Sequence, residues 1–275
     1  MKLNDQNESR AVSNTHGVPA LEGVPFDPFT GFEMYYQPQI DRQRRLVSVE
    51  ALLRWGSLDQ PWSSPGELIA DLERTREIIP LGWWILRTIS IQMQIWSQCD
   101  ELAGVAMSVN VSPVQLQERG FVDKFLTMLD RYRIDARRLI LEVTESVPLS
   151  NLAFIARQME EIKKSGVRFA LDDVGCGYSA LAYIRQLPLD QFKIDREFVS
   201  SIEHSEKDRV MVGAIIGMGK DIGMEVVAEG VENEAQFNIL LGQRCDIFQG
   251  YLFDKPMPVR VWDERYPRDM PRKSM

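Results

Sequence analysis

Polar and charged residues stand near the C-terminal ends of several short, β-rich apolar runs. Asp172 and Asp173 close the run VRFALDDV, and two adjacent carboxylates are poorly suited to the interior of a packed strand. Carboxylate and amide oxygens are the ligands that hard divalent cations prefer. The sequence therefore predicts a metal site with Glu50, Asn110, Glu142 and Glu229 as further oxygen ligands, and the other polar residues near such strand ends are Lys193 and Gln249.

Each of these residues, taken singly, also has an ordinary structural explanation. A carboxylate at a strand end often caps the following helix, and a lone lysine is usually solvated. Together, however, the carboxylates would raise one another's pKa unless cations lay among them. More carboxylates than one ion requires favour two ions, an arrangement that clamps a phosphoryl group and activates water. With no histidine near these runs, we expect two Mg²⁺ or Mn²⁺ ions rather than zinc.

The elements that would position these residues alternate between strands and helices. Amphipathic stretches cover residues 66–75 with 83–96, 120–132 and 153–164, and alternation of this kind indicates a parallel sheet. Eight strands favour a closed (β/α)₈ barrel, in which the strand ends meet on one face. The strand candidates are residues 34–40, 46–55, 105–112, 139–145, 167–174, 191–195, 225–231 and 246–252.

Only DRQRR joins the first two strand candidates, which is too short for a crossover helix. We therefore expect an α/β fold, an irregular (β/α)₈ TIM-like barrel with an antiparallel first hairpin. Three segments are expected, namely an N-terminal tail (1–30) that is disordered or strapped on the barrel, the barrel domain (31–262) and a basic C-terminal tail (263–275).

Composition excludes several classes of protein. The formal net charge of −8 over 275 residues argues against a general binder of DNA or RNA, which would carry a basic patch. No apolar run is long enough to span a membrane, and the N-terminus lacks the hydrophobic segment of a signal peptide. Cys99, Cys176 and Cys245 show no zinc spacing, so we expect a reducing, cytoplasmic environment.

Eight ordered strings spanning Phe32 to Pro258 carry a family resemblance. The sequence resembles the EAL domains, bacterial cyclic di-GMP phosphodiesterases that hydrolyse one phosphodiester bond to give the linear dinucleotide pGpG. The strings are YQPQID (36–41), EALLRW (50–55), SVNVSP (108–113), LEVTES (141–146), DDVGCGYSAL (172–181), FKIDREFV (192–199), AEGVE (228–232) and QGYLFDKPMP (249–258).

The resemblance implies a role for each matching position. Lys193 would orient the attacking water, Gln249 would position it, and Glu229 would lie at the metal centre. The implied metal ligands are Glu50, shared between the ions, then Asn110, Glu142 and Asp172 at the first ion and Asp173 at the second.

The implied substrate residues are Arg54, which would contact phosphate, with Leu52 of the signature, Gln37 and Tyr251. For Gln37 and Tyr251, simple packing in the barrel remains an alternative. Glu145 matches the glutamate that anchors the loop after the paired aspartates.

That loop departs from the family pattern. Active relatives usually read DDFGTGYSSL, whereas this chain has Val174, Cys176 and Ala180 in place of Phe, Thr and Ser. Cys176 is either a small turn residue or a redox-sensitive thiol. The alternatives to an active enzyme are an inactive cyclic di-GMP receptor and a protein-interaction module. Resemblance to relatives that couple this loop to dimerisation also implies a possible homodimer through residues 172–181 and the following helix.

Overall fold

The computed structural model describes residue 29 and residues 31–55, 65–144, 151–174 and 180–266. All the helices and strands described belong to the compact unit Gly31–Met275. Glu145 and the loop residues 175–179 lie outside the described residues. The predictions made for them therefore remain predictions.

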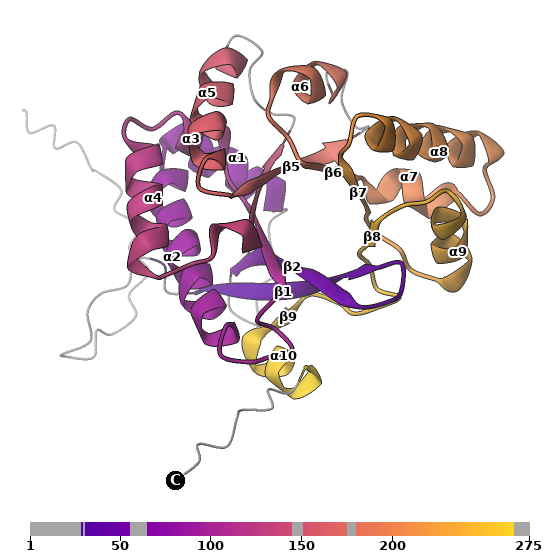
Figure 1. The fold of residues 1–275 in the computed structure, drawn as a ribbon, viewed down its shortest axis with the longest axis horizontal. Helices are drawn as coiled ribbons and strands as arrows, with labels where there is room; N and C mark the ends of the chain where they lie inside the picture. The colour runs from indigo at the N-terminus through magenta and orange to yellow at the C-terminus, as the bar shows by residue number, and fades with distance from the viewer. Residues whose placement is uncertain (1–28, 30, 56–64, 145–150, 175–179, 267–275) are drawn as a thin grey trace, which may run out of the picture. The chain divides into compact units, whose positions relative to one another are not determined.

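Eight strands close into a barrel, which confirms the predicted fold (Figure 1). Strands β2 to β8 follow one another in order, and β1 closes the ring by pairing with both β8 and β2. A short strand, β9 (Met257–Pro258), also pairs antiparallel with β1, at Tyr35 and Tyr36. The barrel strands are β1 (Phe32–Asp41), β2 (Leu46–Trp55), β3 (Ala106–Asn110), β4 (Leu139–Thr144), β5 (Arg168–Val174), β6 (Gln191–Ile194), β7 (Glu225–Ala228) and β8 (Ile247–Phe248).

Strand β1 runs antiparallel to both of its barrel neighbours, as the short DRQRR link predicts. The turn is stabilised by Asp41, whose carboxylate accepts hydrogen bonds from the backbone N–H groups of Gln43 and Arg45. The register places Gln37 opposite Glu50 and Gln39 opposite Ser48. Because strand side chains alternate between faces, both of these pairs lie on the same face of the hairpin.

Helices cover the outside of the barrel (Figure 1). Helix α2 (Ile78–Trp96) begins five residues before the predicted 83–96 segment. It includes Pro80 in its first turn, where a missing N–H costs no hydrogen bond. The other helices are α1 (Pro65–Thr75), α3 (Pro113–Leu116), α4 (Phe121–Arg131), α5 (Leu152–Lys163), α6 (Ala180–Gln186), α7 (Arg196–Ser201), α8 (Glu206–Asp221), α9 (Glu234–Gly242) and α10 (Val259–Arg265).

Among the described helices, none combines the length and apolar character needed to cross a bilayer.

An aromatic cluster fixes the first hairpin against two helices. Tyr36, on the face of β1 opposite to Gln37, packs edge-on against Trp96 of α2 with ring centroids 5.1 Å apart. Trp262 of α10 lies 5.2 Å from Trp96 and contacts the same tyrosine. All three rings are buried, so the hydrophobic effect holds β1 in place while its other face carries polar groups.

Candidate active site

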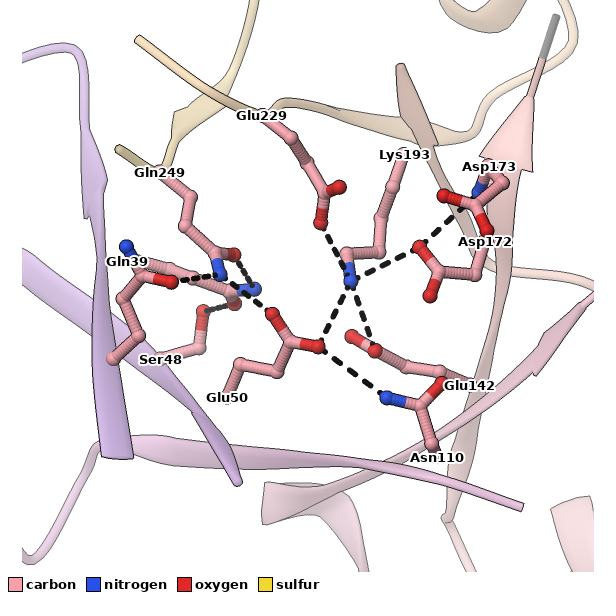
Figure 2. A network of polar contacts seen from close by, with 11 residues as sticks. Gln39, Ser48, Glu50, Asn110, Glu142, Asp172, Asp173, Lys193, Glu229 and Gln249 are labelled. Atoms are coloured by element: carbon pink, nitrogen blue, oxygen red, sulfur yellow. Dashed lines mark hydrogen bonds and ion pairs between the residues drawn. The ribbon is translucent and has the colours of Figure 1, made fainter. Parts of the chain in front are cut away.

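The mouth of the barrel gathers carboxylates around one buried lysine (Figure 2). Lys193, near the end of β6, is 1% exposed. Its Nζ lies 2.6 Å from Glu229, 2.9 Å from Glu142, 3.0 Å from Asp172 and 3.2 Å from Glu50. Residues that are distant in sequence therefore meet because each stands within two residues of the C-terminal end of its strand, except Glu50, which lies mid-strand.

The two adjacent aspartates reach the same site through an irregularity in β5. On a regular strand their side chains would point to opposite faces. Here the pairing of β5 with β6 shifts register between Leu171 and Val174, and Asp173 has a φ of 57°. Aspartate tolerates this left-handed conformation better than most residues. The Asp173 N–H donates to the Asp172 carboxylate at 3.1 Å, and both acids border the mouth.

The charges around Lys193 keep it protonated. Burial alone would lower the pKa of this amine, but the carboxylates of Asp172, Glu142, Glu229 and Glu50 outweigh burial and raise it well above its usual value. Burial likewise acts to raise the pKa of Glu50, yet the Lys193 ammonium and a hydrogen bond from Gln249 bring it below its usual value. The site thus pairs the Lys193 cation with the Glu50 carboxylate.

The remaining acids are less fully compensated. Burial raises the pKa of Glu142 well above its usual value despite the nearby lysine, because Glu50 and Asp172 add repulsion. Burial, together with repulsion from Asp172, raises the pKa of Glu229 to about 8 and that of Asp173 to about 6. One lysine is therefore insufficient to balance this cluster, and further positive charge would stabilise it.

The donor atoms fit divalent cations. Glu50, Glu142 and Asp172 can each present an oxygen within 4.8 Å of the others, and so can Asp172, Asp173 and Glu229. Asp172 is common to both groups, whereas the resemblance assigns the shared position to Glu50. Glu142 Oε1 is buried without a hydrogen-bond partner among the described residues, so it is free to take a cation. Asn110 Nδ2 donates to Glu50 at 3.3 Å, which places its amide beside the first group.

Gln249 connects this cluster to the first hairpin. Its Nε2 donates to Glu50 Oε2 at 2.5 Å and to Gln37 Oε1 at 3.0 Å. Its Oε1 accepts from Gln39 Nε2 at 2.7 Å, and Gln39 Oε1 accepts from the Ser48 hydroxyl at 2.5 Å. Gln39 and Ser48 are absent from the sequence-based site. Their only signal was a polar residue at every second position of the hairpin, a pattern that also fits a solvent-facing strand.

Two pockets open on either side of the cluster. A polar pocket of about 240 Å³ is lined by Glu50, Lys193, Glu229 and Gln249 and by the predicted substrate residues Gln37, Leu52, Arg54 and Tyr251. A second, more apolar pocket of about 480 Å³ lies between α1, α2 and the ends of β2 and β3. The two pockets share Leu52, Arg54 and Asp172.

The two pockets contain residues that the sequence did not predict, in the apolar pocket and in the polar pocket alike. Trp55 and Ile69 contribute apolar surface, and Glu73 contributes a carboxylate that accepts a hydrogen bond from the Ser112 hydroxyl at 2.6 Å. Arg196 at the start of α7 lines the polar pocket beside Glu229. Neither Glu73 nor Arg196 stands at the end of a strand, which was the signal used to select candidates.

Comparisons with known proteins agree with this geometry. The EAL domain family model matches residues 30–256. Signaling protein YkoW of Bacillus subtilis is 33% identical over 234 residues, which are 85% of this chain and 29% of that protein. The bifunctional diguanylate cyclase/cyclic di-GMP phosphodiesterase MucR of Pseudomonas aeruginosa is 35% identical over 226 residues, 82% of this chain and 33% of MucR.

Solved structures show the same similarity. The structure of the PaMucR phosphodiesterase in complex with c-di-GMP has a TM-score of 0.77 and 34% identity, covering 84% of this chain and 94% of that chain. EAL enzyme Bd1971 in its cAMP-bound form has a TM-score of 0.77 and 30% identity, covering 86% of this chain and 66% of that one. The chain spans about a third of the length of the curated relatives YkoW and MucR.

Proposed function

The chain belongs to the EAL domain family, and we propose that it is a divalent-metal-dependent phosphodiesterase that hydrolyses cyclic di-GMP to linear pGpG. The observation that carries this proposal is the position of the acid cluster. Two groups of potential metal ligands share Asp172, and the same residue lines both pockets. A scissile phosphodiester at Asp172 would have room for one nucleoside on each side.

The predicted ligand set is consistent with Mg²⁺ or Mn²⁺ at both groups. All of the candidate ligands offer oxygen, namely Glu50, Asn110, Glu142, Asp172, Asp173 and Glu229. Bound there, two divalent ions would neutralise charge on the phosphate oxygens and acidify a water molecule at the reacting phosphorus.

Lys193 and Gln249 would organise the reacting groups. The Lys193 ammonium lies at the centre of the carboxylates and is fully protonated, so it can donate to the attacking water or to a phosphate oxygen. Gln249 donates to Glu50 and would hold that ligand in a fixed orientation. The reaction would be an in-line displacement, in which the oxygen of water forms a bond to phosphorus while the bond from phosphorus to one ribose oxygen breaks, and that ribose oxygen takes up a proton.

Substrate recognition would divide between the two pockets. Arg54 borders both of them, and its planar guanidinium suits bidentate contact with a phosphate. In the polar pocket, Tyr251 is 55% exposed and offers an aromatic face for stacking with a base. In the apolar pocket, Glu73 offers a carboxylate to the N–H donors of a guanine edge.

The test is incubation of the protein with cyclic di-GMP and Mg²⁺ or Mn²⁺, followed by chromatographic separation of the products. We expect pGpG to appear and EDTA to abolish its formation. A parallel measurement of nucleotide binding in Ca²⁺ separates the alternatives. Binding without hydrolysis in any metal would identify a receptor, and absence of binding would indicate an interaction module; either result would overturn the proposal.

A further inference from the structure

We propose that Gln39 and Ser48 are positioning residues, which set the orientation of the Gln249 amide and thereby hold the Glu50 carboxylate for metal binding. The inference rests on the proposed function because it takes Glu50 as a metal ligand. Neither residue touches the carboxylates around Lys193; both act through Gln249 (Figure 2).

The hydrogen bonds form a chain with a single direction. The Glu50 carboxylate can only accept, so Gln249 must present its NH₂ group to Glu50 Oε2, at 2.5 Å. The carbonyl of Gln249 then points the other way and needs a donor, which Gln39 Nε2 supplies at 2.7 Å. Gln39 Oε1 needs a donor in turn, and the Ser48 hydroxyl supplies it at 2.5 Å. Every link therefore depends on the next, from Ser48 to Glu50.

Burial lets this chain hold the amide orientation from the carbonyl side, while Gln37 Oε1 accepts from the NH₂ side at 3.0 Å. Gln39 is 0% exposed, Ser48 is 2% exposed and Gln249 is 5% exposed. Bulk water is therefore excluded from acting as a substitute donor, and an amide turned by 180° would place its oxygen against the Glu50 carboxylate. The antiparallel register supplies the components, since Gln39 stands opposite Ser48 and Gln37 stands opposite Glu50.

Outer groups that orient a metal ligand commonly change metal affinity by about 10- to 100-fold when removed. We expect Gln39→Met to weaken Mn²⁺ binding to the nucleotide-free protein within that range. Ser48→Ala should weaken it less, because Gln39 keeps its donor contact with Gln249. Gln39→Glu should be the most damaging variant, because a carboxylate in place of the NH₂ group leaves the Gln249 carbonyl facing an acceptor.

The barrel offers matched controls. Ser108 is buried on β3, and its hydroxyl has no hydrogen-bond partner among the described residues. Gln191 is buried on β6, and neither atom of its amide has such a partner. Ser108→Ala and Gln191→Met therefore remove the same groups at the same burial without breaking the chain. Both controls should bind Mn²⁺ as the parent does.

The readouts are Mn²⁺ affinity by calorimetry, the melting temperature in EDTA, and kcat and KM for cyclic di-GMP. For Gln39→Met and Ser48→Ala, the proposal predicts weaker Mn²⁺ binding and a lower kcat at limiting metal, but an unchanged KM at saturating metal. Ser48→Thr keeps the hydroxyl and should bind the metal more tightly than Ser48→Ala. If Gln39→Met and Ser48→Ala bind Mn²⁺ as tightly as their controls, the proposal is wrong. It is also wrong if metal affinity falls only in proportion to melting temperature in Gln39→Met, Ser48→Ala and their two controls alike.

These outcomes are distinct from failure of the proposed function. A parent protein that binds Mn²⁺ but hydrolyses nothing would overturn the phosphodiesterase assignment and leave the affinity comparison interpretable. A phosphodiesterase whose Gln39 variants match their controls would retain the function and lose the positioning role.

Discussion

Replacing Lys193 with methionine tests the electrostatic account of the site directly. The substitution conserves length and removes the cation that, among the described residues, contacts Glu50, Glu142, Asp172 and Glu229. Lys193 is almost fully buried, so the carboxylates would face one another with little screening by solvent. We therefore expect the metal-free variant to be less stable than the parent.

The magnitude follows from the loss of a buried ion-pair partner, which typically costs about 3–5 kcal/mol. For a domain of this size, about 1 kcal/mol changes the melting temperature by roughly 2–4 °C, so the expected decrease is roughly 6–20 °C. Divalent ions would replace the missing positive charge, and an ion at about 100 times its Kd stabilises the folded state by about 2.7 kcal/mol. Mn²⁺ should therefore raise the melting temperature of the variant more than that of the parent.

The assay is thermal unfolding followed by circular dichroism in EDTA and in Mn²⁺, with Lys163→Met as the control. Lys163 pairs with Asp190 at 2.5 Å, but its side chain is 28% exposed and lies outside the acid cluster. The control should lose less stability and should keep the parent's response to Mn²⁺. A Lys193→Met protein that melts with the parent in EDTA, or that gains no more from Mn²⁺ than the parent gains, would refute the reasoning.

Four further predictions concern the same barrel. Glu50→Gln keeps the shape of the side chain and removes its charge, so hydrolysis should fall below detection in product chromatography while nucleotide binding in Ca²⁺ persists; retained turnover would contradict this. Burial raises the pKa of Glu229 to about 8 from an ordinary value of 4.5. Between these two pH values the folded protein therefore keeps a proton on Glu229, whereas the unfolded chain has released it. In EDTA, stability should therefore fall as pH rises through this window, and a melting temperature that climbs from pH 5 to 8 would disprove it. Gly250→Ala would place a Cβ 2.1 Å from the backbone oxygen of Val231, so both the melting temperature and turnover should decrease; an unaltered melt would show that the backbone yields easily. Leu181 on α6 is 67% exposed and belongs to the predicted dimer face, so Leu181→Asp should convert the expected homodimer to a monomer by light scattering, and a variant that stays dimeric would exclude that face.

The sequence predicts the barrel and most of the acid cluster because both depend on local patterns. Apolar runs that end in polar residues locate the strands, and convergence of strand ends in a barrel then brings Glu142, Asp172 and Lys193 together. The five-residue link DRQRR also suffices to predict the antiparallel hairpin, since no crossover fits in that length.

The parts that escape prediction depend on register and on irregular backbone. Nothing in the order of residues states that Gln39 stands opposite Ser48, because a slip of one position would reverse the faces of the strand. The common direction of Asp172 and Asp173 likewise requires the register shift in β5 and the left-handed conformation of Asp173. Glu73 joins the second pocket through the packing of α1, which local pattern does not specify.

The bonds from Gln249 also have a consequence for the synthesis of the chain. Gln249 contacts Glu50, Gln37 and Gln39 across 199 to 212 residues of sequence, and Gln37 in turn contacts the backbone of Asp254 across 217 residues. A ribosome therefore makes the first hairpin long before it makes the segment that contains Gln249 and Asp254. Until β8 and the residues after it have emerged, the nascent chain lacks the donor that orients Glu50, so the acid cluster cannot reach its final arrangement during translation of the earlier strands. Destruction of a signalling nucleotide would thus begin only when the ring of strands has been closed by its last member.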